Sequence, residues 1–172
     1  MIKLNLGCGP DIKDGYVNID TCPINDKVIK MDIMNLEYPE LSIDEIYARD
    51  VIEHMSIEQG KKCIANWSKI CKPNAKLFIQ TICWDTILQA YYANIWDIET
   101  VNYMLFAGDN WVDGNSRPED FHKSVYNVKL LSSILTANNF KIDRIELNTI
   151  DEDLLRNKRS HNLNMLMYAT KI

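Results

Sequence analysis

Two glycines and an aspartate near the N-terminus form the pattern with the clearest chemical meaning in this chain. Gly7 and Gly9 follow an apolar run over residues 2–6, and Asp20 ends the next apolar run, over residues 16–19. Glycine allows the backbone angles of a tight turn and places no Cβ beside a ligand. In an open α/β sheet the loop after the first strand lies at the carboxyl edge, where a carboxylate on the next strand can accept the hydroxyls of a ribose. The pattern therefore predicts a pocket for a nucleoside-containing cofactor.

The spacing of this loop argues against a dinucleotide. The dinucleotide fingerprint is Gly-x-Gly-x-x-Gly, with an acidic residue about 20 positions further on. Here Ile12 stands where the third glycine would be, and Asp20 follows Gly9 by only 11 positions. Because a parallel crossover normally needs a dozen or more residues, we expect the first helix to be very short or absent, with the reduction centred on residues 11–15. A nicotinamide oxidoreductase is disfavoured for the same reasons.

A second group of residues could carry acid–base chemistry. Asp50, Glu53 and His54 follow the apolar run over residues 43–48, and His122 lies in a later irregular segment. Neutral imidazole accepts a proton near pH 7, so His122 is the best candidate for a general base, although a surface histidine is an open alternative. Asp50 and His54 are the other catalytic candidates, and Glu53 near a helix start is expected to be structural. No second cluster of ligands is evident, so we expect no metal.

Composition limits the classes of protein that the chain can represent. Its 172 residues suffice for one domain with a real core, and the net charge of −5 argues against nucleic acid as the main partner, since phosphate binding needs a basic face. No apolar run is long enough to span a bilayer, so we expect no membrane contact. The five cysteines are scattered and odd in number, which predicts a reduced, cytoplasmic protein.

Hydrophobic periodicity predicts an alternation of strands and helices. Strands are expected over residues 2–6, 16–19, 28–31, 43–48, 76–83, 141–148 and 163–171, and helices over 57–71, ended by Pro73-Asn74, and 127–138. This order predicts an α/β fold, namely a single doubly wound, mostly parallel sheet with an antiparallel edge strand.

The segment 84–125 has the least regular pattern and is predicted to be an insertion after the fifth strand, within one domain spanning residues 1–172. Gly108 to Pro118 reads as a loop. Trp84, Trp96 and Trp111 in this segment are candidates for a substrate pocket or for ordinary packing. His161 is expected to be a turn residue.

Several motifs in order resemble one enzyme family. They cover residues 4–10 (Leu-Asn-Leu-Gly-Cys-Gly-Pro), 15–20, 30–33, 44–54 and 120–124. Together they resemble class I S-adenosylmethionine-dependent methyltransferases, in particular a short bacterial-type family with a truncated first helix. The resemblance implies a Rossmann-like methyltransferase fold and S-adenosylmethionine as the cofactor.

The same resemblance assigns roles to single residues. It implies that Gly7, Cys8 and Gly9 surround the cofactor and that Asp20 binds its ribose. Asp32 would then lie beside the adenine amino group, with Ile33 as an apolar wall. Asp50 would lie next to the transferring methyl group, and so counts as both a cofactor-binding and a catalytic candidate.

The function expected from these observations is methyl transfer to a small-molecule or sugar acceptor, on oxygen or nitrogen. The alternative is a non-catalytic subunit with the same fold, which binds S-adenosylmethionine or serves as a partner. Because the chain begins at the first strand, we expect the segment 84–125 to act as the lid and to supply substrate specificity. An oligomeric state is left open by the sequence.

Overall fold

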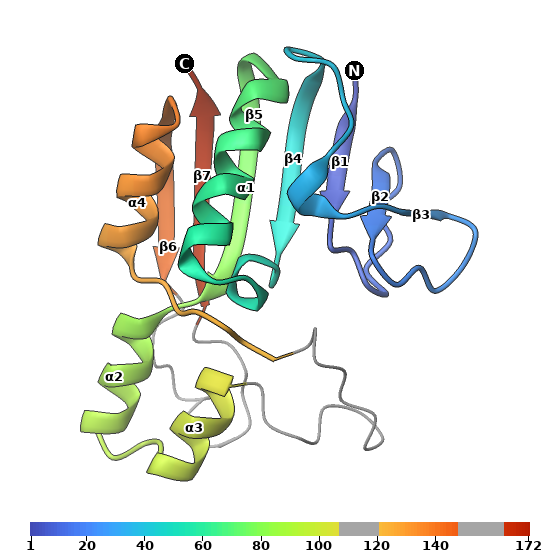
Figure 1. Ribbon diagram of the computed structural model, residues 1–172. Helices are drawn as coiled ribbons and strands as arrows, with labels where there is room; N and C mark the ends of the chain where they lie inside the picture. Colours follow the sequence, from blue (N-terminus) through green and yellow to red (C-terminus); the bar gives the residue numbers. More distant parts are fainter. Residues whose placement is uncertain (107–120, 148–163) are drawn as a thin grey trace.

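The sheet is the centre of the fold. The computed structural model describes residues 1–106, 121–147 and 164–172, and within them seven strands pair in the order β3-β2-β1-β4-β5-β7-β6 (Figure 1). All strands run parallel except β7, which is antiparallel to both β5 and β6. The strands are β1 (Lys3–Leu6), β2 (Val17–Asp20), β3 (Val28–Lys30), β4 (Ile43–Arg49), β5 (Cys71–Ile82), β6 (Phe140–Leu147) and β7 (Asn164–Lys171). The predicted mostly parallel α/β sheet with an antiparallel strand near one edge is confirmed.

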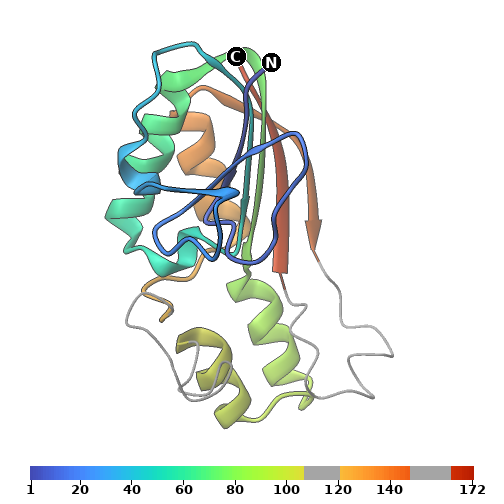
Figure 2. The same ribbon diagram turned by 90° about the vertical axis from the view of Figure 1, so that its right-hand side faces the viewer.

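The helices that pack on the sheet lie on one of its faces. Helices α1 (Ile57–Ile70) and α4 (Val128–Ala137) share a face, as Figure 2 shows. Right-handed crossovers in opposite directions lie on opposite faces of a sheet. The connections from β1 to β2 and from β2 to β3 run in the opposite direction along the sheet, so they belong to the face opposite α1 and α4, here called the second face. Both connections are short loops. The predicted loss of the first helix is therefore confirmed, and no helix in the described part of the chain covers the second face.

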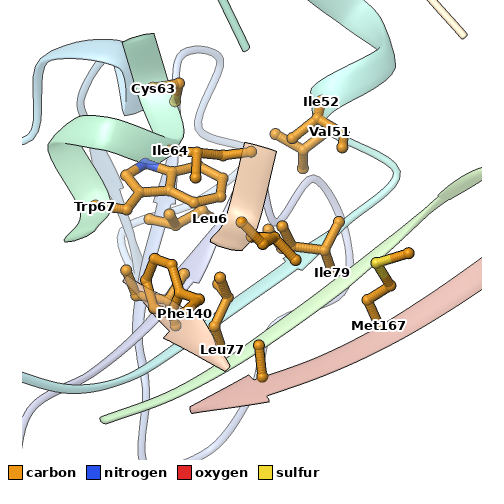
Figure 3. Packing of buried hydrophobic residues seen from close by; sticks show 14 of the residues in the cluster. Leu6, Val51, Ile52, Cys63, Ile64, Trp67, Leu77, Ile79, Phe140 and Met167 are labelled. Atoms are coloured by element: carbon orange, nitrogen blue, oxygen red, sulfur yellow. The ribbon is translucent and has the colours of Figure 1, made fainter. Parts of the chain in front are cut away.

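The core fills the space between α1, α4 and the sheet (Figure 3). Trp67 of α1 is fully buried, and its indole N–H donates to the carbonyl of Ile33 at 3.2 Å. That carbonyl belongs to the short helix η1 (Ile33–Asn35), so the bond ties the connection between β3 and β4 to α1. Around Trp67 lie apolar side chains such as Leu6, Ile64 and Leu77, each contributing about 1.5–3 kcal/mol by burial.

Helix α1 begins with a capping box made by Ser56 and Gln59 and ends at Ile70. The helix predicted over residues 57–71 is confirmed within one residue, whereas the strand predicted to start at residue 76 begins at Cys71. Cys71 pairs with Ile43, and the ladder absorbs the extra residues by a register shift, with Asn74 at φ 69°. Pairing with β4 thus decides where the helix ends and the strand begins, and it outweighs the local signal of the proline.

Two helices, α2 (Trp84–Tyr92) and α3 (Ile98–Phe106), occupy the segment that follows β5. They lie beyond the carboxyl ends of the parallel strands (Figure 1). Trp96 is buried between them in a small apolar cluster with Ile87 and Val101. The expected loop from Gly108 to Pro118, Trp111 and His161 lie outside the described residues. Among the described helices, none combines the length and the apolarity that crossing a bilayer requires.

Candidate functional site

The loop after β1 is built around its two glycines. Gly7 and Gly9 have φ angles of 59° and 48°, in the left-handed region. A Cβ on Gly7 would lie 2.7 Å from a methyl carbon of Val51, so only glycine lets the loops after β1 and β4 approach this closely. A Cβ on Gly9 would meet no atom within 4 Å. The loop is therefore packed against the protein at Gly7 and open toward a ligand at Gly9.

Cys8 lies between these glycines and faces inward. It is buried, and its N–H donates to the carbonyl of Ile19 at 3.1 Å. Burial, with a further contribution from the charge of Asp20, raises the pKa of its thiol. Cys8 thus pins the loop to β2 and stays protonated at neutral pH, which suits packing and not nucleophilic chemistry.

Asp20 ends β2 beside the glycine loop. One carboxylate oxygen accepts the N–H of Gly9 and the other accepts the N–H of Cys22, both at 2.8 Å. Each oxygen of a carboxylate has a further lone pair, and the side chain is partly exposed. Asp20 is therefore oriented by the loop and still able to accept hydrogen bonds from a ligand.

Asp32 and Ile33 follow β3 at the same edge of the sheet. The carboxylate of Asp32 caps η1, accepting the N–H of Met34 at 2.9 Å and the side-chain amide of Asn35 at 3.0 Å. Ile33 is partly buried and packs against the core. Asp32 thus has a structural role as the cap of η1.

Asp50 lies just beyond β4 and has a positive φ of 52°, which is uncommon for a residue with a side chain. Two contacts to Gln80 hold it: the N–H of Asp50 donates to the carbonyl of Gln80 at 3.0 Å, and the Gln80 side chain donates to the carboxylate at 3.1 Å. Since Val51 contacts Gly7, Asp50 is next in sequence to a residue that touches the glycine loop. Gln80 was missed by the sequence analysis, although a polar residue near the carboxyl end of a strand is a usable signal.

Glu53 is the most deeply buried acid among the described residues, with 1% of its surface exposed. The hydroxyl of Thr81 donates to its carboxyl group at 2.9 Å. Burial, followed by the charge of Asp50, raises the pKa of Glu53 to about 8. Its backbone carbonyl accepts the N–H groups of Lys123 and Ser124 at 2.8 and 3.1 Å. Glu53 is thus largely protonated at neutral pH and fixes the segment that carries His122.

His54 and His122 meet although 68 residues separate them in the sequence. Their ring centroids are 5.0 Å apart with the planes inclined by 65°. The Nδ1 atom of His122 lies 3.0 Å from the carbonyl of Met104 in α3. Burial, and then the proximity of His54, lowers the pKa of His122 to about 4. His122 is therefore a neutral, largely enclosed residue, and a carbonyl beside Nδ1 places its proton there and leaves Nε2 as the acceptor.

The surroundings of His122 form a hollow of about 200 Å³. Its walls come from the start of α2, the end of α3 and the segment after His122: Trp84, Leu105, Phe106, Lys123, Ser124 and Val125. The structure thus brings Glu53, His54 and His122 together at one place, and Gly7, Gly9 and Asp20 at a neighbouring place, with Asp50 one residue before Val51. Val51, between Asp50 and Glu53 in sequence, connects the two.

Comparison with known proteins gives the site a family. Residues 4–79 match the model of a family described as methyltransferase domain. A phosphoethanolamine N-methyltransferase of Plasmodium falciparum is 30% identical over 150 residues, which are 85% of this chain. The chain spans about half of that curated relative, 47% of its length. The chain is therefore similar to methyltransferases over most of its length.

Solved structures show the same fold. A methyltransferase from Methanosarcina mazei superposes with a TM-score of 0.67 at 17% identity, covering 99% of this chain and 92% of that one. A 1,6-didemethyltoxoflavin-N1-methyltransferase from Burkholderia thailandensis, with bound S-adenosylhomocysteine, gives 0.61 at 12% identity and covers 99% and 70%. These structures confirm the predicted fold, and the similarities together support the predictions of the family, of the enzyme class and of S-adenosylmethionine as the cofactor.

Proposed function

We propose that this chain binds S-adenosylmethionine at the loop of Gly7 to Gly9 and transfers its methyl group to a small-molecule or sugar acceptor. The observation that carries the proposal is the carboxylate of Asp20, held 2.8 Å from the backbone N–H of Gly9 beside open space. An acid oriented by the glycine loop itself suits the two hydroxyls of a ribose. Bound S-adenosylmethionine would supply an already activated methyl group on its sulfonium.

The residues present fit this cofactor. The space at Gly9 admits a ligand against the backbone, and both oxygens of Asp20 retain lone pairs. Asp32 and Ile33 lie at the same edge of the sheet and are proposed to contact the adenine. Asp50 is the first residue of the loop after β4. What these residues contribute is binding and orientation, because an activated donor mainly requires the acceptor to be held in line.

The acceptor side of the site favours a nitrogen nucleophile. His122 is neutral with a pKa lowered to about 4, and Glu53, with a pKa of about 8, is largely protonated. Neither group is a strong base at neutral pH, so a hydroxyl would be activated poorly, whereas an amine can enter neutral. The name of the Plasmodium relative, which states an N-methyltransferase, supports the same choice. We propose that Nε2 of His122 accepts a hydrogen bond from the acceptor nitrogen and so orients it, and that the proton released on methylation passes to water.

Helices α2 and α3 are proposed to cover the acceptor. The carbonyl of Met104 in α3 contacts His122, and the next residues are bonded to the carbonyl of Glu53. A cofactor bound at the glycine loop can therefore influence α3 through Val51, Glu53 and His122. Hydrogen exchange with and without S-adenosylhomocysteine tests this idea. Protection in residues 98–106 and 121–125 supports a lid, and protection confined to the glycine loop and Asp32 rejects it.

The activity itself is tested by release of S-adenosylhomocysteine in the presence of panels of small amines, hydroxyl compounds and sugars. The proposal expects turnover with at least one panel, favouring amines. The alternative, a non-catalytic subunit that binds the cofactor, expects binding without turnover in any panel. The net charge of −5 supports a small molecule over nucleic acid as the substrate, and the cytoplasmic location stays a prediction.

A further inference from the structure

The second face of the sheet carries a row of aromatic side chains. Tyr47 of β4, Phe78 of β5 and Tyr168 of β7 are direct neighbours in register. The ring centroids of Tyr47 and Phe78 are 4.5 Å apart and nearly parallel, and those of Phe78 and Tyr168 are 5.0 Å apart, edge to face. This is the face opposite α1 and α4 (Figure 2). Sheets that are mostly parallel are normally covered on both faces.

The ends of the aromatic row are closed by cations. The ammonium of Lys13 lies 4.0 Å from the ring centroid of Tyr47, and the guanidinium of Arg144 lies 4.0 Å from that of Tyr168. A cation therefore covers one ring face at each end of the row, and Tyr47 and Phe78 cover one face of each other. Base stacking on single-stranded nucleic acid needs free ring faces, so this row favours a protein occupant.

The charges beside the aromatic row alternate in sign across the sheet. Lys3 of β1, Glu45 of β4 and Lys76 of β5 lie in register on neighbouring strands, and Asp143 of β6 reaches Lys76 across β7. Lys3 lies 2.8 Å from Glu45, and Lys76 lies 3.8 Å from Asp143. The sequence of signs is plus, minus, plus, minus. Its central pair, Glu45 and Lys76, is complementary to its own reversal, which is the arrangement that a two-fold axis produces.

We propose that this face binds the same face of a second copy of the chain. A two-fold axis along the strands, between β4 and β5, places Glu45 opposite Lys76 of the partner subunit. The same axis places Tyr47 opposite Phe78 of the partner subunit. One axis thus matches the central charge pair and the central ring pair, as an isologous interface requires.

The size of the face agrees with such an interface. The face holds a shallow hollow of about 960 Å³, lined by the three rings of the aromatic row and by Glu45, Lys76 and Asp143. Five neighbouring strands span about 19 Å and the length of β7 about 26 Å. The resulting footprint of about 500 Å² in projection, enlarged by side-chain relief, is of the order of the about 800 Å² that each partner buries in a stable complex.

Analytical ultracentrifugation of two charge-reversal variants tests the proposal. In a dimer of Lys76→Glu alone, Glu45 would face the negative charge introduced at position 76 of the partner subunit. In a dimer of Glu45→Lys alone, the positive charge introduced at position 45 would face Lys76 of the partner subunit. Each variant should therefore be monomeric by itself. In an equimolar mixture both central contacts regain opposite signs, and the heterodimer should form. Lys61→Glu, which changes an exposed lysine of α1 on the helix-covered side, should dimerise like the wild type.

A wild-type chain that stays monomeric up to its solubility limit overturns the proposal and leaves the face to a different protein. A dimer of either variant alone places the interface elsewhere and also overturns it. The proposal is likewise wrong if both variants fold by circular dichroism and their mixture stays monomeric. Cofactor affinity is a separate readout, so this result is independent of the proposed function.

Discussion

The carboxylate of Asp20 accepts a hydrogen bond from the backbone N–H of Gly9 at 2.8 Å. The bond joins the acid at the end of β2 to the loop after β1. Its second oxygen accepts the N–H of Cys22, so the carboxylate is held on both sides. Asp20 thus shapes the loop that it is proposed to serve, and the two motifs read separately in the sequence form a single unit.

Substitution of Gly9 should abolish cofactor binding without unfolding the protein. Gly9→Val places a branched side chain in the open space and strains a backbone with a φ of 48°. Gly15 is a matched control, because its φ of 80° is also positive and a Cβ there also meets no atom within 4 Å. We expect calorimetry to detect S-adenosylhomocysteine binding to Gly15→Val and none to Gly9→Val. Equal affinities would place the cofactor elsewhere.

The stability of the protein should fall as the pH rises toward 8, because of Glu53. The folded pKa of about 8 exceeds the ordinary value of 4.5, so the folded state binds more protons than the unfolded state between these values. Stability from this group is complete below pH 4.5 and is lost as pH rises through 8.

The best pH range for this measurement is 6.5 to 8. In this range His122 is neutral in the folded state, and the pH exceeds the ordinary histidine pKa of 6.5, which applies to the unfolded state. The wild-type free energy of unfolding should drop by about 1–2 kcal/mol across it. Glu53→Gln keeps an acceptor for Thr81 and should show a clearly smaller drop. Identical pH slopes for both proteins would contradict a raised pKa.

His122 should remain neutral throughout the physiological range. Burial lowers its pKa to about 4, and the carbonyl of Met104 fixes the Nδ1 tautomer. Long-range nitrogen–proton correlation spectra of the three histidines report this directly, with His122→Asn assigning the signal. We expect its midpoint to lie below pH 5. A midpoint close to the ordinary value would mean that the ring is solvated.

Gly60 and Tyr126 should show strong coupling in a double-mutant cycle. A Cβ on Gly60 in α1 would lie 2.3 Å from the hydroxyl oxygen of Tyr126 but 3.5 Å from its ring carbon. Gly60→Ala should cost about 1–3 kcal/mol by overpacking. In the background of Tyr126→Phe the same change should be neutral or stabilising by up to about 1 kcal/mol, because alanine favours a helix. Additive effects in urea unfolding would contradict this packing.

Much of the fold could be predicted because its signals are local. The apolar runs that became β1, β2 and β4 each end at the chemistry-bearing residues Gly7, Asp20 and Asp50. The lost first helix followed from the short distance between Gly9 and Asp20. The early strand start at Cys71 could not be read locally, since pairing with Ile43 outweighs the proline signal.

The site was only partly predictable because its second half depends on long-range contacts. Nothing near His122 in the sequence shows that its ring meets His54 or that Met104 holds its Nδ1 atom. Glu53 was expected to be structural through a helix dipole, whereas its burial and its bond to Thr81 give the role. Burial of a charged group depends on what the rest of the chain places over it.

The most direct test of the account is calorimetric titration of Asp20 variants with S-adenosylhomocysteine. Asp20→Ala would remove the two charge-assisted hydrogen bonds proposed to the ribose, each worth roughly 1.5–3 kcal/mol, so Kd should rise by about 10²-fold or more. Asp20→Asn keeps an acceptor for Gly9 and should lose less, and Glu58→Ala, at an exposed acid of α1, should bind like the wild type. If Asp20→Ala is folded and binds within about twofold of the wild type, the assignment of the cofactor site is contradicted.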